Sequence, residues 1–122
     1  MRLRKDCIRD LLLYFEKELT YDKRVRADYI TFDEYTKEEI IYTCDKLLEA
    51  GMINAKKSNN FANNYPVITI ESITPSGHKL IDNIKDPEIW SETKNKLKVL
   101  KDVSIDIISQ VAATIITTRL GI

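Results

Sequence analysis

The segment that most constrains the fold is a capped helix followed directly by two strand-like runs. Thr36-Lys37-Glu38-Glu39 has the form of a capping box, in which the threonine oxygen accepts from a free amide and Glu39 reaches back. Apolar residues recur behind it at helical spacing, and Gly51 can end the helix in the left-handed conformation. The pattern predicts a helix over 36–50, two strands over 52–57 and 66–71, and a polar loop over 58–64 at the tip of the hairpin.

The same rules predict one helix before this unit and three after it. Apolar residues at three- and four-residue spacing predict the first helix, and a β-branched and aromatic run at 29–32 predicts a short strand. Thr74-Pro75 and Asp86-Pro87 each combine a capping side chain with proline at the first helical position. The predicted order is helix 3–19, strand 29–32, helix 36–50, hairpin 52–71, and helices beginning near 74, 86 and 102.

This order of elements is typical of a winged-helix domain, in which the hairpin forms the wing. We therefore expect an α+β, mainly helical fold, with a winged-helix-like core over residues 1–85. Residues 86–122 form a C-terminal helical extension, expected to be part of the same compact domain. The stretch 20–35 is too short to hold a loop, a strand and a full second helix. Because that helix normally braces the recognition helix on the DNA backbone, its loss weakens the case for DNA reading.

Several stretches, in a fixed order, resemble an uncharacterised family of small bacterial and phage or prophage proteins. The resemblance covers nearly the whole chain and implies a winged-helix fold and a phage or prophage setting, but no activity and no functional residues. It rests on Tyr35-Thr36-Lys37-Glu38-Glu39-Ile40, Leu47-Leu48-Glu49-Ala50-Gly51-Met52-Ile53, Thr74-Pro75-Ser76-Gly77-His78, Leu80-Ile81-Asp82-Asn83-Ile84, Trp90 and the C-terminal Ile122.

The charges balance over the whole chain but not along it. The 19 basic and 19 acidic residues give a formal net charge of zero, whereas nucleic-acid binders usually carry a basic excess. Residues 1–26 hold eight Lys and Arg against five Asp and Glu, and residues 27–50 hold two against seven. The sequence therefore places positive charge at the N-terminus and negative charge on the segment that contains the capped helix.

Three groups of residues are candidates for binding DNA or RNA. The hairpin offers cations and amides without a carboxylate, and Phe61 and Tyr65 could stack on bases. The outer helix face, which includes Thr43, could contact bases, and the N-terminus could contact phosphates. The alternatives are an ordinary polar turn and a solvated helix face. The candidates are Lys56, Lys57, Asn59, Asn60, Asn63 and Asn64 of the hairpin, Lys37, Tyr42 and Lys46 of the helix, and Arg2, Arg4 and Lys5.

The last helix is apolar over more than half of its circumference, and its polar residues are mostly uncharged. A helix packed on one side of a monomer has a narrower apolar stripe and a charged outer face. The pattern favours burial on two sides and a homodimer, because two-fold pairs are the commonest assembly. The alternative is a helix buried in a monomeric core. The candidate interface residues are Ile105, Ile108, Val111, Ala112, Ile115 and Ile116.

The sequence predicts no catalytic site, no metal and no cofactor. His78 is the single histidine, and Ser76 and Asp82 lie on the same short helix, whereas a catalytic triad needs convergent groups from separate elements. Cys7 and Cys44 fall on apolar helix positions and are expected to be reduced core residues of a cytoplasmic protein. No apolar stretch is long enough to cross a bilayer.

Two hypotheses for function remain open. The first is a non-enzymatic, dimeric nucleic-acid-binding regulator of phage or prophage genes, which uses the wing and the basic N-terminus. The alternative is a protein-interaction module, an adaptor or a phage factor that binds a host protein, without nucleic-acid binding. A continuous basic face across the wing favours the first, and scattered charge favours the second.

Overall fold

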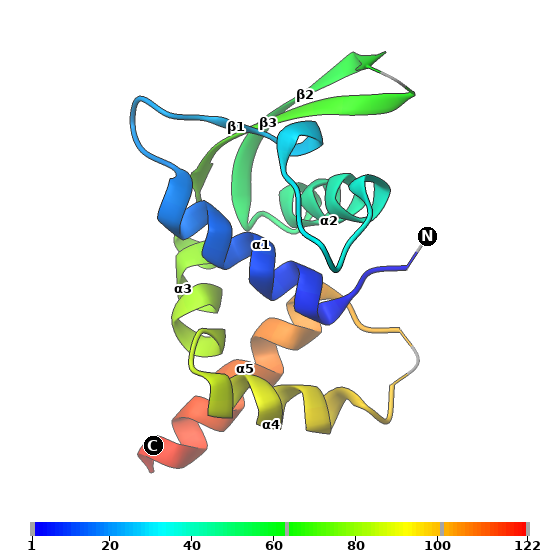
Figure 1. Cartoon of the computed structure of the whole chain (residues 1–122). Coiled ribbons are helices and arrows are strands. Elements are labelled where there is room, and N and C mark those ends of the chain that lie inside the picture. Colours follow the sequence, from blue (N-terminus) through cyan, green and yellow to red (C-terminus); the bar gives the residue numbers. More distant parts are fainter. Residues whose placement is uncertain (1, 63, 101, 122) are drawn as a thin grey trace.

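The computed structural model describes residues 2–62, 64–100 and 102–121, and for residues 59–62 it describes the backbone alone (Figure 1). The predicted α+β, mainly helical class is confirmed. One antiparallel sheet has the strand order β1-β3-β2. In chain order the elements are α1 (Lys5–Glu18), β1 (Val25–Arg26), the 3₁₀ turn η1 (Ala27–Tyr29), α2 (Lys37–Glu49), β2 (Ile53–Ala62), β3 (Tyr65–Ile73), α3 (Pro75–Ile84), α4 (Pro87–Leu97) and α5 (Ile105–Leu120).

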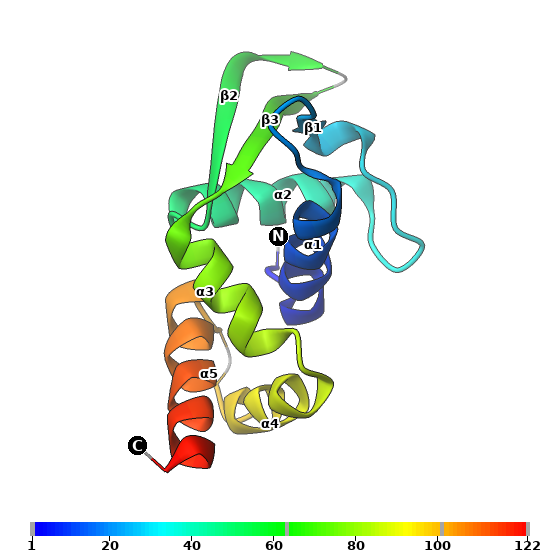
Figure 2. The same ribbon diagram turned by 90° about the vertical axis from the view of Figure 1, so that its left-hand side faces the viewer.

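The sheet and the last two helices lie at opposite ends of the molecule. Figures 1 and 2 show the hairpin at one end, α1 and α2 next to it, and α3 leading away to α4 and α5. Helix α1 contacts α2, α3 and β3, and α5 contacts α3 and α4. One cluster of buried side chains extends from Cys7 in α1 to Ala112 in α5. The C-terminal helices therefore share a hydrophobic core with the rest of the chain.

The predicted short strand at 29–32 is wrong in its position. The strand is β1, in which Val25 pairs with Ile70, and the residues after Arg26 turn into η1. Arg26 holds that turn through two hydrogen bonds to the Asp28 carboxylate, at 3.0 and 2.7 Å. Phe32 lies edge-on to neighbouring aromatic rings rather than in a sheet. Burial of an aromatic side chain thus decides the local backbone here, rather than the β propensity of the run.

The predicted long polar loop at the tip of the hairpin is also wrong. Strand β2 continues to Ala62, which pairs with Tyr65 at the start of β3. Asn64 has a φ of 69°, a left-handed conformation that asparagine tolerates better than most residues. The asparagines were assigned to a loop because they favour turns, but β2 runs through Asn59 and Asn60, which lie where the register shifts between Ser58 and Phe61. Asn63 lies outside the described residues.

The predicted helix ends are confirmed where a capping side chain was identified. Thr36 accepts from the Glu39 amide at 3.1 Å, and the Glu39 carboxylate accepts from the Thr36 amide at 2.9 Å, which completes the capping box. Asp86 accepts from the amides that open α4, and Gly51 and Gly121 have φ values of 75° and 73°. Local side-chain chemistry therefore determines where these helices begin and end.

The start of α3 packs directly against the chain segment that joins α2 to β2. The Thr74 hydroxyl donates to the Gly51 carbonyl at 2.6 Å, and the Thr74 amide donates to the Met52 carbonyl at 3.1 Å. Gly77 lies so close that a Cβ atom on it would be 2.0 Å from the Met52 carbonyl oxygen and 2.8 Å from Ile73 Cγ2. This junction fixes the direction in which α3 leaves the sheet.

A second link joins α4 to the first turn of α1. The indole nitrogen of Trp90 donates to the Asp6 carboxylate at 2.9 Å, and Lys94 Nζ donates to the same oxygen at 3.1 Å. Partial burial alone would raise the pKa of Asp6, but the hydrogen bonds from Trp90 and Lys94 outweigh it and hold the pKa below its usual value. The ionised carboxylate therefore contributes to the docking of α4.

Helix α5 is buried on one side by its own chain. Arg119, near its end, pairs with Glu88 and Glu92 of α4 at 3.4 and 2.8 Å. On its outer face the threonine hydroxyls donate to backbone carbonyls within the helix, as Thr114 does to Gln110. Burial of the second side by a partner, as expected from the sequence, stays a prediction. Of the predicted interface residues, Ile105, Ile108, Ala112 and Ile115 are buried in the monomer, and Val111 and Ile116 are half-buried.

Within the described parts of the chain, no helix combines the length and the apolar character needed to cross a membrane.

We expect Gly77→Ala to destabilise the protein. Alanine normally stabilises a helix relative to glycine, but here the added methyl group overlaps the Met52 carbonyl oxygen. The expected cost is about 1–3 kcal/mol, measured as a shift of the urea unfolding midpoint. The neighbouring exposed substitution Ser76→Ala is the control and should change stability by less than about 0.5 kcal/mol. A Gly77→Ala protein as stable as the parent would contradict the close approach.

We expect Asp6→Asn to lower the melting temperature at neutral pH and to have progressively less effect in acid. The folded-state pKa of Asp6 is depressed, so its contribution is present above the unfolded pKa of about 3.9 and is lost as the pH falls through the folded value. Circular dichroism melts from pH 7 to pH 3 measure this difference. Asp82→Asn, at an exposed position on α3, is the control. A difference that does not depend on pH would show that the charge of Asp6 is unimportant.

Candidate recognition surface

Helix α2 presents a mixed outer face between the N-terminal segment and the hairpin. Lys37, Glu38 and Glu49 are exposed, and Tyr42 and Lys46 are half-buried, with Lys46 Nζ 5.2 Å from the centre of the Tyr42 ring. Thr43, expected as a possible base contact, is instead buried, and its hydroxyl donates to the Glu39 carbonyl at 2.7 Å. It was expected on the outer face because it is polar, but its burial is permitted by this hydrogen bond to the helix backbone.

Three of the cations predicted to bind nucleic acid are paired with carboxylates of α2. Arg4 lies 3.2 Å from Glu39, Lys46 lies 2.9 Å from Glu49, and Lys57 lies 3.0 Å from both oxygens of Asp45. These pairs join the N-terminal segment, α2 and β2 into one continuous surface. We call it the recognition surface and define it as the outer side chains Arg2, Arg4, Lys5, Lys37, Glu38, Glu39, Tyr42, Asp45, Lys46, Glu49 and Lys57.

The ion pairs also stabilise the charged forms of these groups. The hydrogen bond from the Thr36 amide, followed by that from Arg4, lowers the pKa of Glu39. The hydrogen bond to Glu39 raises the pKa of Arg4, and the hydrogen bond to Glu49 raises the pKa of Lys46. These hydrogen bonds therefore favour the charged forms of Arg4, Glu39 and Lys46.

The hairpin presents fewer free groups than the sequence suggested. Lys56 and Lys57 are both exposed, but only Lys57 faces α2 and its carboxylate, because neighbouring strand residues point to opposite faces. Lys56 pairs across the sheet with Thr69, which in turn pairs with Arg26 of β1. Asn64 is exposed at the turn, and the side chains of Asn59 and Asn60 lie outside the described ones. The hairpin therefore offers one unpaired cation, Lys56, among the lysines that the structure describes there.

A hollow of about 880 Å³ brings the N-terminus, α2, α4 and α5 together, and we call it the N-terminal hollow. Of the predicted candidates it collects Arg2, Arg4, Lys5 and Tyr42. Among the described residues, Arg2 and Lys5 have no carboxylate partner. Sequence reasoning missed the remaining members, because they lie about a hundred positions away along the chain and carry no motif. Those residues are Lys94, Asp102, Val103, Ser104 and Ile107, and Leu3 and Asp6 complete the lining.

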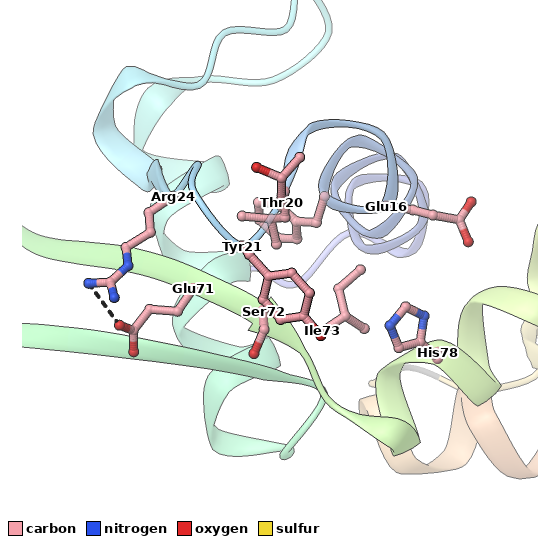
Figure 3. A pocket seen from close by; sticks show the side chains of 10 residues that line it. Glu16, Thr20, Tyr21, Arg24, Glu71, Ser72, Ile73 and His78 are labelled. Atoms are coloured by element: carbon pink, nitrogen blue, oxygen red, sulfur yellow. Dashed lines mark ion pairs between the residues drawn. The ribbon is translucent and has the colours of Figure 1, made fainter.

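A second hollow, of about 640 Å³, lies beside His78 (Figure 3). Glu16 of α1, and Glu71 and Ser72 of β3, line it together with His78, whereas Ser76 and Asp82 do not. Figure 3 shows the Arg24–Glu71 ion pair, of 3.0 Å, at one end of this hollow and His78 at the other. No hydrogen bond joins the imidazole to a carboxylate or hydroxyl among the described side chains. The groups in this hollow are not arranged as a nucleophile with its base.

Both cysteines are buried and free, as the sequence predicted. Burial raises the pKa of the Cys7 and Cys44 thiols, so both remain protonated and unreactive at neutral pH. The Tyr35 hydroxyl donates to Asp10 at 2.7 Å, and burial, followed by this hydrogen bond, raises the pKa of Tyr35. In the part of the chain that the structure describes, no three potential metal ligands lie together.

Comparison with known proteins places the chain in a family. An "Uncharacterized protein" of Haemophilus influenzae is 31% identical to this chain over 122 residues, which cover 99% of this chain and 100% of the relative. No solved structure matches the chain. A family model described as "Hypothetical protein (DUF2513)" matches residues 2–104, a range that includes the recognition surface and most of the lining of the N-terminal hollow. The protein therefore belongs to the DUF2513 family.

Proposed function

We propose that this protein is a non-enzymatic binding module that recognises another protein through the recognition surface. Its scaffold is a winged helix, in which α2 takes the place of the recognition helix and β2 and β3 form the wing. The order of elements and the β1-β3-β2 sheet support this assignment. Only the turn η1 occupies the position of the second helix, so the element that braces DNA-binding winged helices on the backbone is missing.

The observation that carries the proposal is the pairing of surface cations with carboxylates of α2. Nucleic-acid affinity depends on cations that replace counterions on phosphates. Arg4, Lys46 and Lys57 would each have to leave a carboxylate, which would then face the phosphates unpaired. A protein partner suits this surface better, because an interface can meet alternating charges with opposite ones and enclose an aromatic ring such as Tyr42.

Nucleic-acid binding is the second candidate, and a specific set of groups favours it. Arg2, Lys5, Lys37 and Lys56 have no carboxylate partner among the described residues, and Asn64 is exposed at the turn of the hairpin. These cations are spread over the N-terminus, α2 and β2, with the paired carboxylates of α2 among them. We rank this candidate below protein recognition because the cations do not form one continuous basic face.

We retain the homodimer as a proposal, although its interface would have fewer residues than the sequence predicted. The core of the single chain already uses four of the six residues predicted at the interface. A second copy would contact the remaining Val111 and Ile116, together with Ile107, which is 38% exposed. We propose a host protein as the principal partner, because these three side chains offer a second copy only a small contact area.

Affinity capture with charge-reversed variants tests the proposed function. Immobilised parent protein, the double variant Glu38→Lys/Glu49→Lys, and the control Lys17→Glu/Lys79→Glu are exposed to lysate of the bacterium that encodes the chain. We expect a stoichiometric partner that the parent and the control retain and that the α2 variant retains about tenfold less. The purified partner should rebind at a ratio near one to one in calorimetry.

Two results would contradict the proposal. One is a captured set of proteins that is the same for the parent and for Glu38→Lys/Glu49→Lys. The other is recovery of nucleic acid in place of protein, with retention that increases in the α2 variant because two carboxylates have been removed.

A further inference from the structure

The N-terminal hollow has unpaired cations on one side and an apolar wall on the other. Arg2 and Lys5 come from the start of the chain, and Val103 and Ile107 come from the start of α5. We propose that this hollow binds an acidic segment of a partner protein that carries an apolar or aromatic side chain next to its carboxylates. This inference rests on the proposed function, and it identifies the chemistry of the partner.

The cations of the hollow differ in how firmly they are held. Arg4 is fixed by Glu39 and by the carbonyl of Glu34, at 3.2 and 3.1 Å, and Lys94 is fixed by Asp6. Arg2 and Lys5 have no such partners among the described groups. An incoming carboxylate can therefore pair with Arg2 and Lys5 without breaking an existing ion pair, so charge complementarity is available at low cost.

Exposed apolar side chains also occur in the segment that leads to the apolar side of the hollow. Val99 and Leu100, in the connection that leads from α4 to α5, are 87% and 43% exposed, and Ile107 follows at 38%. Three of the six large apolar side chains that are exposed in the described chain thus fall between residues 99 and 107; the others are Tyr21, Tyr29 and Leu120. Within the hollow, Val103 and Ile107 share one lining with the unpaired Arg2 and Lys5, a combination typical of a surface that binds a peptide rather than of a solvated one.

The size and the carboxylates of the hollow favour a peptide over a nucleic acid. A volume of about 880 Å³ is sufficient for two or three side chains. Asp6 and Asp102 also line the hollow. A nucleic-acid backbone carries a charge at every residue and would bring phosphates against them, whereas a peptide can place its few carboxylates at Arg2 and Lys5.

The test measures binding of three fluorescein-labelled probes to the intact protein by fluorescence polarisation. The probes are the random copolymer poly(Glu,Tyr), poly(Glu), and single-stranded mixed-sequence DNA of matched charge. We expect poly(Glu,Tyr) to bind most tightly. Its Kd should rise by about tenfold or more in Arg2→Glu/Lys5→Glu, and also in Ile107→Asp, which removes the apolar wall instead of the charge. Lys17→Glu/Lys79→Glu carries the same change of charge at exposed positions away from the hollow, and should leave the Kd unchanged.

Equal binding of poly(Glu,Tyr) to the parent and to Arg2→Glu/Lys5→Glu, or no binding at all, would overturn the proposal. So would poly(Glu) that binds as tightly as poly(Glu,Tyr), or DNA that binds more tightly than both. The capture experiment separates this failure from failure of the proposed function. A partner lost by Glu38→Lys/Glu49→Lys but retained by Arg2→Glu/Lys5→Glu would place recognition on α2 and leave the hollow without this role.

Discussion

The close approach of Gly77 to the Met52 carbonyl determines where the last third of the chain lies. Only a residue without a side chain lets the first turn of α3 rest against the α2–β2 segment. Thr74 strengthens the contact by donating to Gly51 while it caps α3. The direction of α3 then brings α4 and α5 back towards the first turn of α1, where Trp90 reaches Asp6. The N-terminal hollow exists because these two contacts, far apart in the chain, are both made.

The parts of this structure that could be predicted from the sequence are those determined by local chemistry. The capping box at Thr36 and the proline that follows Thr74 define helix ends through neighbouring atoms. The strand expected at 29–32 failed because Phe32 packs edge-on against Tyr35, three residues on, and against Tyr14 of α1. The tip of the hairpin was misplaced because asparagine is typical of turns, whereas Asn59 and Asn60 lie within β2 at a shift in its register. The hollow was missed because its two sides meet only after α4 and α5 have docked.

Folding pairs charged segments that are separate in the sequence. The basic N-terminus and the acidic segment that follows it are adjacent in the fold, and Arg4 pairs with Glu39. Lys57 of the hairpin forms an ion pair with Asp45 in the same way. Net neutrality is therefore achieved locally, across the helix that would otherwise approach a nucleic acid. This local pairing of charges is why we propose protein recognition as the use of this scaffold, with a small cationic hollow at one end.

The salt dependence of nucleic-acid binding tests this assignment most directly. The intact protein is titrated against labelled mixed-sequence duplex DNA by fluorescence polarisation, from about 20 mM to about 200 mM salt. Because Arg4, Lys46 and Lys57 are paired with α2 carboxylates and the unpaired cations do not form one basic face, we predict no saturable binding, even at the lowest salt. Tight binding at low salt that weakens by about a hundredfold or more over this range would mean that several cations reach phosphates, and would contradict the account.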